Sequence, residues 1–252
     1  MANGTVSYRG QELTRGDMGP SNDTFEYFED FIGCLELRSV AVGVDAASVS
    51  QYPGTLVSTV GTDATITAVA NGATSGGSIS FDAASTTLEA LSIPNCSIDV
   101  DAGDWFIEAR VSVETLGAVV FAFGLQENVS FTASLAQTVG AAGDDVVMMF
   151  YDSGSTTAGL LESSVTKNTD HTANANAAAG MTGAQLVAGT FHRLAIRHDK
   201  GLGKVYFYFD GSLVDEVANT NMSDQILHPF IGSGGSALAS IVVDYVYVLA
   251  DR

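Results

Sequence analysis

The stretch Phe191–Val217, with the sequence FHRLAIRHDKGLGKVYFYFDGSLVDEV, decides the fold. Apolar side chains alternate with polar ones along 191–199 and again along 205–209, and a glycine-containing turn separates the two runs. Alternation with a period of two residues, interrupted by glycine-rich turns, is typical of antiparallel β-structure. The pair Asp210-Gly211 then predicts a tight hairpin turn, because glycine readily adopts the positive φ that such turns require. The residues from there to Val217 are expected to form the return strand.

Two other runs show the same alternation. In Asp104–Thr115 the odd-numbered residues from Trp105 to Val113 are all apolar and share one face of the expected strand. The even-numbered residues from Phe106 to Glu114 share the second face, which is expected to contact mostly water. In Leu238–Leu249 the odd-numbered residues from Ile241 to Tyr247 alternate with the even-numbered ones, and this strand is expected to pair beside the first strand of the domain. The residues that share the apolar face of the first run are Trp105, Ile107, Ala109, Val111 and Val113.

Segments that are apolar on both faces predict central strands at 118–125 and 145–151. Shorter runs predict further strands at 65–69, 78–81, 88–93 and 160–165. The tract Asp152–Gly189 is otherwise rich in small polar residues, and its part Thr169–Gly183 has low complexity. We expect a long loop there, which is either functional or flexible.

This pattern resembles the concanavalin A-like, laminin G-like jelly-roll family, in which an aromatic residue opens an alternating strand and an aromatic-rich strand ends in Asp-Gly. Here Phe191 opens the strand, and Asp210-Gly211 ends the aromatic run. The segment Glu29-Asp30-Phe31 also resembles the first strand of jelly-roll domains in structural proteins of tailed phages. The resemblance implies an all-β fold, an antiparallel two-sheet β-sandwich (concanavalin A-like jelly roll). It implies little about function, because one sandwich fold hosts many functions.

The length of 252 residues fits one large sandwich preceded by an extended N-terminal arm. We expect the arm at residues 1–23 and the jelly-roll β-sandwich domain at 24–252. The arm is polar, has no sustained period and holds Arg9 and Arg15, two of only ten basic residues. Its Arg15-Gly16-Asp17 spells an integrin-type tripeptide, but such short sequences recur by chance.

The formal net charge of −19 limits the partners of this acidic protein. Phosphate backbones and anionic membrane surfaces repel such a chain, so we expect no nucleic-acid partner and no membrane partner. No apolar run is long enough to span a bilayer, and the sequence predicts no secretory signal. The two cysteines, Cys34 and Cys96, are either paired in a disulfide or buried as free thiols, and the sequence favours free thiols.

The sequence predicts no catalytic residue, no metal ligand and no cofactor. None of the four histidines lies in a metal-binding pattern or beside a nucleophile, so structural roles are favoured; they are His171, His192, His198 and His228. The nucleophile elbow Gly-x-Ser-x-Gly and the Glu-x-Asp-x-x-Glu pattern of β-glucanases with this fold are both absent from the sequence.

Two groups of residues leave alternatives open. The acidic loop with Asp99, Asp101 and Asp104 is either a Ca²⁺ site or a solvated turn, and the turn is favoured. The pair Asp144-Asp145 presents a weaker form of the same alternative. The tyrosines Tyr206 and Tyr208 either stack on a sugar or form cross-strand pairs that stabilise the sheet.

Three functions compete. The favoured one is a non-enzymatic virion structural protein, a phage capsid decoration or cement protein. It would bind the major capsid protein or other virion proteins through its arm and sandwich surface. We expect it on the capsid surface after assembly in the host cytoplasm, as a homo-oligomer such as a trimer.

The alternative is a lectin-like carbohydrate-binding module, or the receptor-binding part of a phage tail fibre. This alternative predicts a glycan ligand and an aromatic cleft on the concave sheet, with Tyr206, Tyr208 or Trp105 as the stacking surface. A glycoside hydrolase would need a pair of carboxylates flanking the scissile bond. No strand carries such a pair in the expected pattern, so an enzyme is disfavoured.

Overall fold

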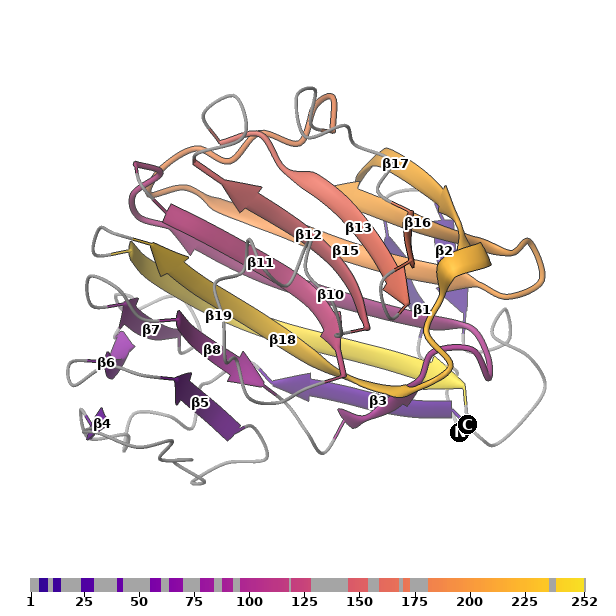
Figure 1. The fold of residues 1–252 in the computed structure, drawn as a ribbon, viewed down its shortest axis with the longest axis horizontal. Helices are drawn as coiled ribbons and strands as arrows, with labels where there is room; N and C mark the ends of the chain where they lie inside the picture. The colour runs from indigo at the N-terminus through magenta and orange to yellow at the C-terminus, as the bar shows by residue number, and fades with distance from the viewer. Residues whose placement is uncertain are drawn as a thin grey trace.

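The computed structural model describes residues 5–8, 11–14, 24–29, 40–42, 55–59, 64–69, 78–83, 88–92, 96–117, 119–127, 145–153, 159–167, 170–172, 181–235 and 239–251. Most of these residues lie in strands of two antiparallel sheets that pack face to face (Figure 1). The prediction of an all-β, two-sheet sandwich is confirmed. No helix in these ranges is long and apolar enough to cross a membrane.

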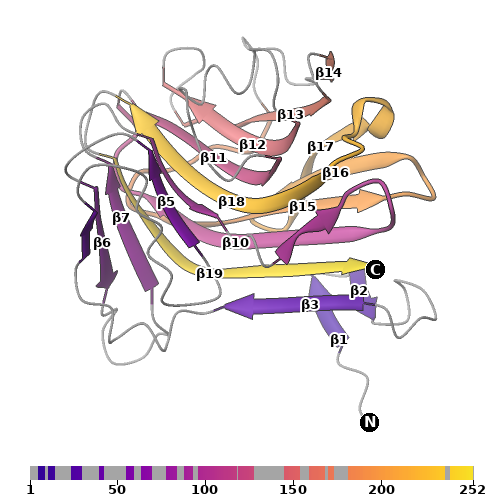
Figure 2. The same cartoon turned by 60° about the horizontal axis from the view of Figure 1, so that its bottom comes forward.

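The larger sheet contains nine strands. They are β3 (Thr24–Glu29), β4 (Val40–Val42), β6 (Ala64–Val69), β7 (Ser78–Ala83), β10 (Trp105–Val113), β15 (Phe191–Asp199), β16 (Lys204–Phe209), β17 (Ser212–Ala218) and β19 (Ala239–Asp251). Their order is β17-β16-β15-β10-β19-β7-β6-β4. Strand β3 pairs with the C-terminal part of β19, so the predicted pairing of the first and last strands of the domain is confirmed (Figure 2).

The smaller sheet contains eight strands. They are β5 (Thr55–Thr59), β8 (Leu88–Ser92), β9 (Ile98–Asp99), β11 (Val119–Gln126), β12 (Val146–Asp152), β13 (Glu162–Lys167), β14 (Asp170–Thr172) and β18 (Ile226–Gly235). Their order is β14-β13-β12-β11-β18-β8-β5, and β9 pairs with one end of β18. The apolar strands β11 and β12 lie inside the sheet, as predicted. A short 3₁₀ turn, η3 (Asn219–Asn221), connects β17 toward β18.

The stretch that decided the fold forms β15, β16 and β17, joined by two turns as expected. At the second turn Asp210 and Gly211 have φ values of 49° and 82°, the left-handed pair that a two-residue hairpin needs. The side chain of Asp210 strengthens the turn, because its Oδ1 accepts a hydrogen bond of 2.9 Å from the backbone N–H of Arg193. A register shift between Phe207 and Tyr208 interrupts the pairing with β17.

The core lies between the two sheets. Alternate residues of β10 point into it and are at most 1% exposed, which confirms the predicted apolar face. Alternate residues of β11 and β12 meet them from the other sheet. Burying a large apolar side chain of this kind stabilises a fold by about 1.5–3 kcal/mol. The largest side chains at the centre are Trp105, Phe121, Phe123, Tyr151 and Phe207.

The second face of β10 is drier than predicted. Phe106, Glu108 and Ser112 are buried on it, whereas Arg110 is half-buried. The prediction of a mostly wet face is therefore wrong. The physical reason is the central place of β10 between β15 and β19, whose long side chains lean over it. The ring of Tyr247, for example, lies 6.0 Å from that of Phe106.

The face assignment along β19 is also corrected. Its pairing with β10 shifts register between Arg110 and Val111, and Asp244 is the additional residue at this point. A bulge of one residue exchanges the two faces of all residues beyond it. Ile241 and Val243 face the core before the bulge, and Val246, Val248 and Ala250 face it after the bulge. Tyr245 and Tyr247 therefore point outward, which corrects the prediction that they share the face of Ile241 and Val243.

The tract Asp152–Gly189 is not a loop throughout. It contains β13 and β14, and an isolated bridge joins Leu160 to Gln185. Leu161, Met181, Ala184 and Leu186 from this tract are buried in the core. Residues 154–158, 168–169 and 173–180 lie outside the described ranges.

The N-terminal arm contains a two-stranded hairpin, β1 (Thr5–Tyr8) and β2 (Gln11–Thr14). The two strands pair in register from Thr5 opposite Thr14 to Tyr8 opposite Gln11. The division into an arm at 1–23 and a sandwich domain at 24–252 stays a prediction. The hairpin adds regular structure to a segment for which the sequence showed no period.

Candidate ligand pocket

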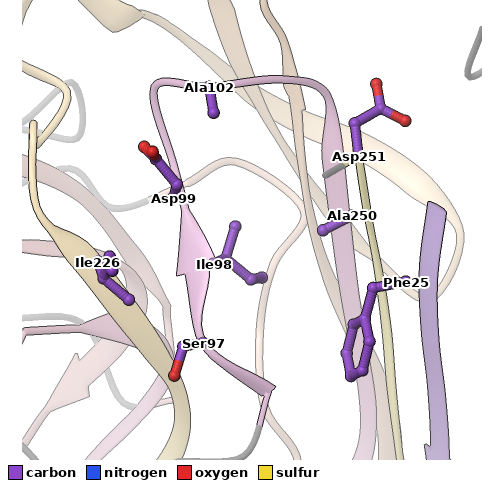
Figure 3. Close-up of a pocket in the computed structure, with 8 residues that line it drawn as sticks. All are labelled: Phe25, Ser97, Ile98, Asp99, Ala102, Ile226, Ala250 and Asp251. Atoms are coloured by element: carbon purple, nitrogen blue, oxygen red, sulfur yellow. The ribbon is translucent and has the colours of Figure 1, made fainter. Parts of the chain in front are cut away.

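A pocket of about 320 Å³ lies where the end of β19 approaches β9 and β18 (Figure 3). Its lining residues come from four strands, from the residue before β9 and from the turn after β9. They are Phe25, Ser97, Ile98, Asp99, Ala102, Ile226, Ala250 and Asp251. This volume is at the lower end of the range for small-molecule sites, so the pocket suits one ring-sized group.

The pocket has one apolar part and one acidic part. Figure 3 places the ring of Phe25 at one end, and it places Asp99 and Asp251 on opposite sides of the other end with their carboxylates pointing apart. Ile98 forms part of the buried core, whereas Ile226 is 56% exposed and forms an open wall. The lining therefore offers both an apolar surface and hydrogen-bond acceptors.

The side chain of Asp251 is the most unusual polar group of the pocket. Its Oδ1 is buried and has no hydrogen-bond partner among the described residues. Burial raises the pKa of this carboxyl, the nearby Asp104 carboxylate adds to the rise, and a backbone hydrogen bond with Asp104 opposes it. Close packing explains the burial, because a Cβ on Gly103 would lie only 2.7 Å from the Cβ of Asp251.

A hydroxyl–imidazole contact lies at the other end. Ser97 Oγ is 3.0 Å from Nδ1 of His228, and the two residues are 131 positions apart in the sequence. This contact links the start of β9 to β18 beside the pocket. It therefore helps to hold the apolar wall in place.

The acidic loop beside the pocket is organised by a lysine. Lys200 Nζ donates to the backbone oxygens of Asp101 and Ala102 at 2.8 and 3.0 Å, and its backbone N–H donates to Asp104 Oδ1 at 2.8 Å. The ammonium group of Lys200 thus binds backbone oxygens of this loop. In the described part of the chain no three His, Cys, Asp or Glu side chains are placed to hold a metal ion.

Three of the four histidines have described side chains, and all three make hydrogen bonds. His192 is 2.8 Å from Asp210 Oδ2 through Nδ1, and its Nε2 accepts from the backbone N–H of Val187 at 3.1 Å. His198 is fully buried between Gly103 and Asn219. His228 contacts Ser97 as described above.

The aromatic residues predicted to stack on a sugar do not line this pocket. Trp105 belongs to the core and donates from Nε1 to the Val100 carbonyl at 3.1 Å, so a role as a surface stacking platform is wrong. Tyr206 and Tyr208 are half-buried on the side of the nine-stranded sheet that faces away from the core. The guanidinium of Arg197 lies 5.8 Å from the ring centroid of Tyr206.

Two other predicted groups take structural positions. Cys96 is a free, buried thiol, which confirms the favoured state for this cysteine. Asp145 is buried and accepts a hydrogen bond of 2.5 Å from Ser223 Oγ. The predicted features outside the described residues are Arg15-Gly16-Asp17, Asp30-Phe31, Cys34, Asp144 and the side chain of His171.

Only one lining residue, Asp99, was among the candidates from the sequence, and there it belonged to an acidic loop for which a solvated turn was favoured over a Ca²⁺ site. Sequence reasoning missed Phe25, Ile226 and Asp251, which are separated by up to the full length of the domain. No local signal marks them, since each reads as an ordinary strand residue. The pairing of β3 with β19 and of β9 with β18 brings them together.

Comparison with known proteins gives matches at the level of structure. Neither the protein-family models nor the curated proteins that were searched match this sequence. The Emp47p carbohydrate recognition domain superposes with a TM-score of 0.53 and 9% identity, over 83% of this chain and all of that domain. A sialidase superposes with a TM-score of 0.53 and 10% identity, over 88% of this chain but only 18% of the sialidase.

A glucuronan lyase of the fungus Trichoderma reesei is similar at a TM-score of 0.47 and 11% identity, over 85% of this chain and 95% of the lyase. At such low identity, likeness speaks for the fold alone. Together with the two antiparallel sheets, the better superpositions show that this chain has the concanavalin A-like jelly-roll sandwich fold.

Proposed function

We propose that this chain is a non-enzymatic binding protein that holds a carbohydrate in the pocket between β3, β9, β18 and β19. The observation that carries the proposal is the two-part lining, with the Phe25 ring at one end and the Asp99 and Asp251 carboxylates at the other. A sugar ring has an apolar C–H face and a rim of hydroxyl donors. The first matches an aromatic wall, and the second matches carboxylate acceptors.

The unpaired oxygen of Asp251 supports this use of the pocket. A buried acceptor without a partner costs free energy, and a ligand hydroxyl that reaches it would recover part of that cost. Asp99 is exposed at the same end, so a second hydroxyl can reach its carboxylate from water. The fold likeness to a carbohydrate recognition domain is consistent with the proposal.

Binding without catalysis is part of the proposal. Two carboxylates in one pocket are also what glycoside hydrolysis requires, so turnover is the activity to test. Asp251 is packed against Gly103, and its backbone N–H donates to the Asp104 carbonyl at 2.9 Å. These contacts give it a structural role at the end of β19, and we expect no hydrolysis of bound glycans.

The test is a glycan array followed by titration calorimetry with the full chain. Asp99→Asn and Phe25→Ala should each weaken binding of the selected glycan about tenfold or more, the loss of one charge-assisted bond or one aromatic wall. Leu202→Ala, at the 66% exposed tip of the β15–β16 turn, is the matched control and should bind normally. Binding that survives both pocket changes, or an array without any ligand, would refute the proposal. Release of reducing sugar would refute its non-enzymatic part.

A second candidate is the virion role, a capsid decoration or cement protein located on the capsid surface and assembled in the host cytoplasm. The observation that favours it is the end strand of the nine-stranded sheet, β17, which exposes Leu213 and one backbone edge in the described structure. An exposed edge can accept a strand from a partner such as the major capsid protein or another copy of the chain.

Electron microscopy of capsids that lack the chain, with and without added purified protein, tests this role. New surface density that is lost with Leu213→Pro would support it, because proline blocks strand pairing. Unchanged capsids at saturating protein would exclude it. A receptor-binding part of a phage tail fibre would fit the glycan proposal without the capsid role.

A further inference from the structure

The outer side of the nine-stranded sheet, the side away from the core, carries a second apolar cluster. It consists of Phe106, Ala195, Tyr247 and Leu249, with Tyr208 packed against them. None of the first four is more than 9% exposed. Side chains from neighbouring strands lean over this face, as they do on β10, and leave a dry apolar surface whose edge at Tyr208 is half-buried.

A rim of charged and aromatic side chains surrounds this cluster. Arg110 is 2.6 Å from Asp244, and its guanidinium lies 4.6 Å from the ring centroid of Phe191. On the same strand Glu108 accepts a hydrogen bond of 2.5 Å from the hydroxyl of Tyr245. Aromatic residues and arginine around a dry centre are typical of a surface that binds protein.

The N-terminal hairpin β1–β2 lies on this side of the sheet. Figure 1 shows it behind β16, and Figure 2 shows it beyond the nine-stranded sheet, away from the eight-stranded one. Its strands have four residues each and pair only with one another in the described sheets. A two-stranded hairpin is at best marginally stable in water unless it packs against another surface.

We propose that the outer face of the nine-stranded sheet is the docking surface for the N-terminal arm of the same chain, residues 1–23. Electrostatics permits this contact. The arm holds Arg9 and Arg15 against Glu12, Asp17 and Asp23, so it carries only one of the 19 net negative charges of the chain. A strongly acidic segment in the same place would face Glu108, Asp244 and the rest of an acidic protein.

The docked arm covers the apolar cluster and is held by surface packing, without strand pairing to the sheet. Such a contact is reversible, because short strands bury little area. Release of the arm would expose two partner-binding elements at once, the hairpin edges and the aromatic face. This proposal stands independently of the glycan pocket, which lies at the end of β19 and uses the inward side chain of Phe25.

Hydrogen–deuterium exchange on the full chain tests the proposal. In the unaltered protein the paired amides of 5–8 and 11–14 should exchange at least about tenfold more slowly than in an unstructured peptide. Tyr208→Asp places a charge at the edge of the cluster and should abolish that protection. Leu202→Asp is the matched control, on an exposed turn, and should leave it unchanged.

Trypsin provides a second measurement, because Arg9 and Arg15 lie in the arm. Cleavage there should be at least about tenfold faster in Tyr208→Asp than in the control. Arg197→Glu serves as the second variant if Tyr208→Asp fails to fold. Rapid exchange of the hairpin in the unaltered protein, or protection that persists in both folded variants, would overturn the proposal. A dimer by light scattering with a protected arm would also overturn it, since the arm would then dock on a neighbouring copy.

Discussion

His198 offers the sharpest test of the packing described above. The side chain is fully buried in β15, 5.6 Å from the ring of Trp105. Its Nδ1 is 2.9 Å from the Gly103 carbonyl, and its Nε2 is 3.1 Å from the Asn219 amide nitrogen. A carbonyl only accepts and an amide nitrogen only donates, so the ring is neutral, with its proton on Nδ1.

Replacement of His198 by Phe keeps a ring of similar shape and removes both nitrogens. Two neutral hydrogen bonds are lost, at about 1 kcal/mol each, and the groups of Gly103 and Asn219 lose their partners. We therefore expect the free energy of unfolding near neutral pH to fall by about 2–4 kcal/mol. Urea unfolding followed by fluorescence measures it directly, because Trp105 is the only tryptophan in the chain and contacts the altered ring.

The pH dependence of the free energy of unfolding can refute the assignment of His198 as a neutral ring. Burial lowers the pKa of His198, and the Gly103 carbonyl and nearby carboxylates oppose the shift only in part. The unfolded chain therefore binds a proton more readily than the folded one. The contribution of the neutral ring is present above the ordinary histidine pKa of about 6.5 and is lost as the pH falls below that value.

The variant has no imidazole to protonate, so its free energy of unfolding does not fall with pH for this reason. As the pH falls from about 7.5 to about 5.5, the difference in the free energy of unfolding between the two proteins should narrow by up to about 1.4 kcal/mol. Other titrating groups cancel, since both proteins contain them. A difference that stays constant or widens as the pH falls would refute the assignment of His198 as a buried neutral ring.

Two further changes test the core. Gly124→Ala on β11 would place a Cβ 2.1 Å from the Val147 carbonyl oxygen, so we expect the free energy of unfolding in urea to fall by about 3 kcal/mol or more. Gly117→Ala is the control, because no atom lies within 4 Å of its new Cβ, and it should change the free energy of unfolding by less than about 0.5 kcal/mol. Equal effects at the two glycines would contradict the close pairing of β11 with β12 at Gly124. In a Cys34→Ser background Cys96 should react with a thiol reagent at least about a hundredfold more slowly when folded than in urea, because burial raises its pKa to about 12 and blocks access. Equal rates in the two states would show that Cys96 is accessible.

Much of the fold could be predicted from local patterns. The alternation along 191–209 and the Asp210-Gly211 turn defined β15 to β17, because side chains on a strand alternate between faces regardless of what lies elsewhere. The same rule failed in β19 beyond Asp244, where one additional residue exchanges the faces. It also misjudged the second face of β10, because alternation shows which residues share a face but not what covers that face.

Local sequence patterns are enough to predict antiparallel strands with an apolar side in this chain, since period-two alternation and glycine turns act within a few residues. Folding of the whole chain brings Phe25, Asp99, Ile226 and Asp251 into one pocket, and it puts the β1–β2 hairpin on the outer side of the nine-stranded sheet (Figure 2). The hairpin pairs only within itself, so its place depends on surface packing, whereas the pocket depends on strand pairings between distant segments. Such pairings are selected by the packing of the whole sandwich, so no short stretch of sequence contains them.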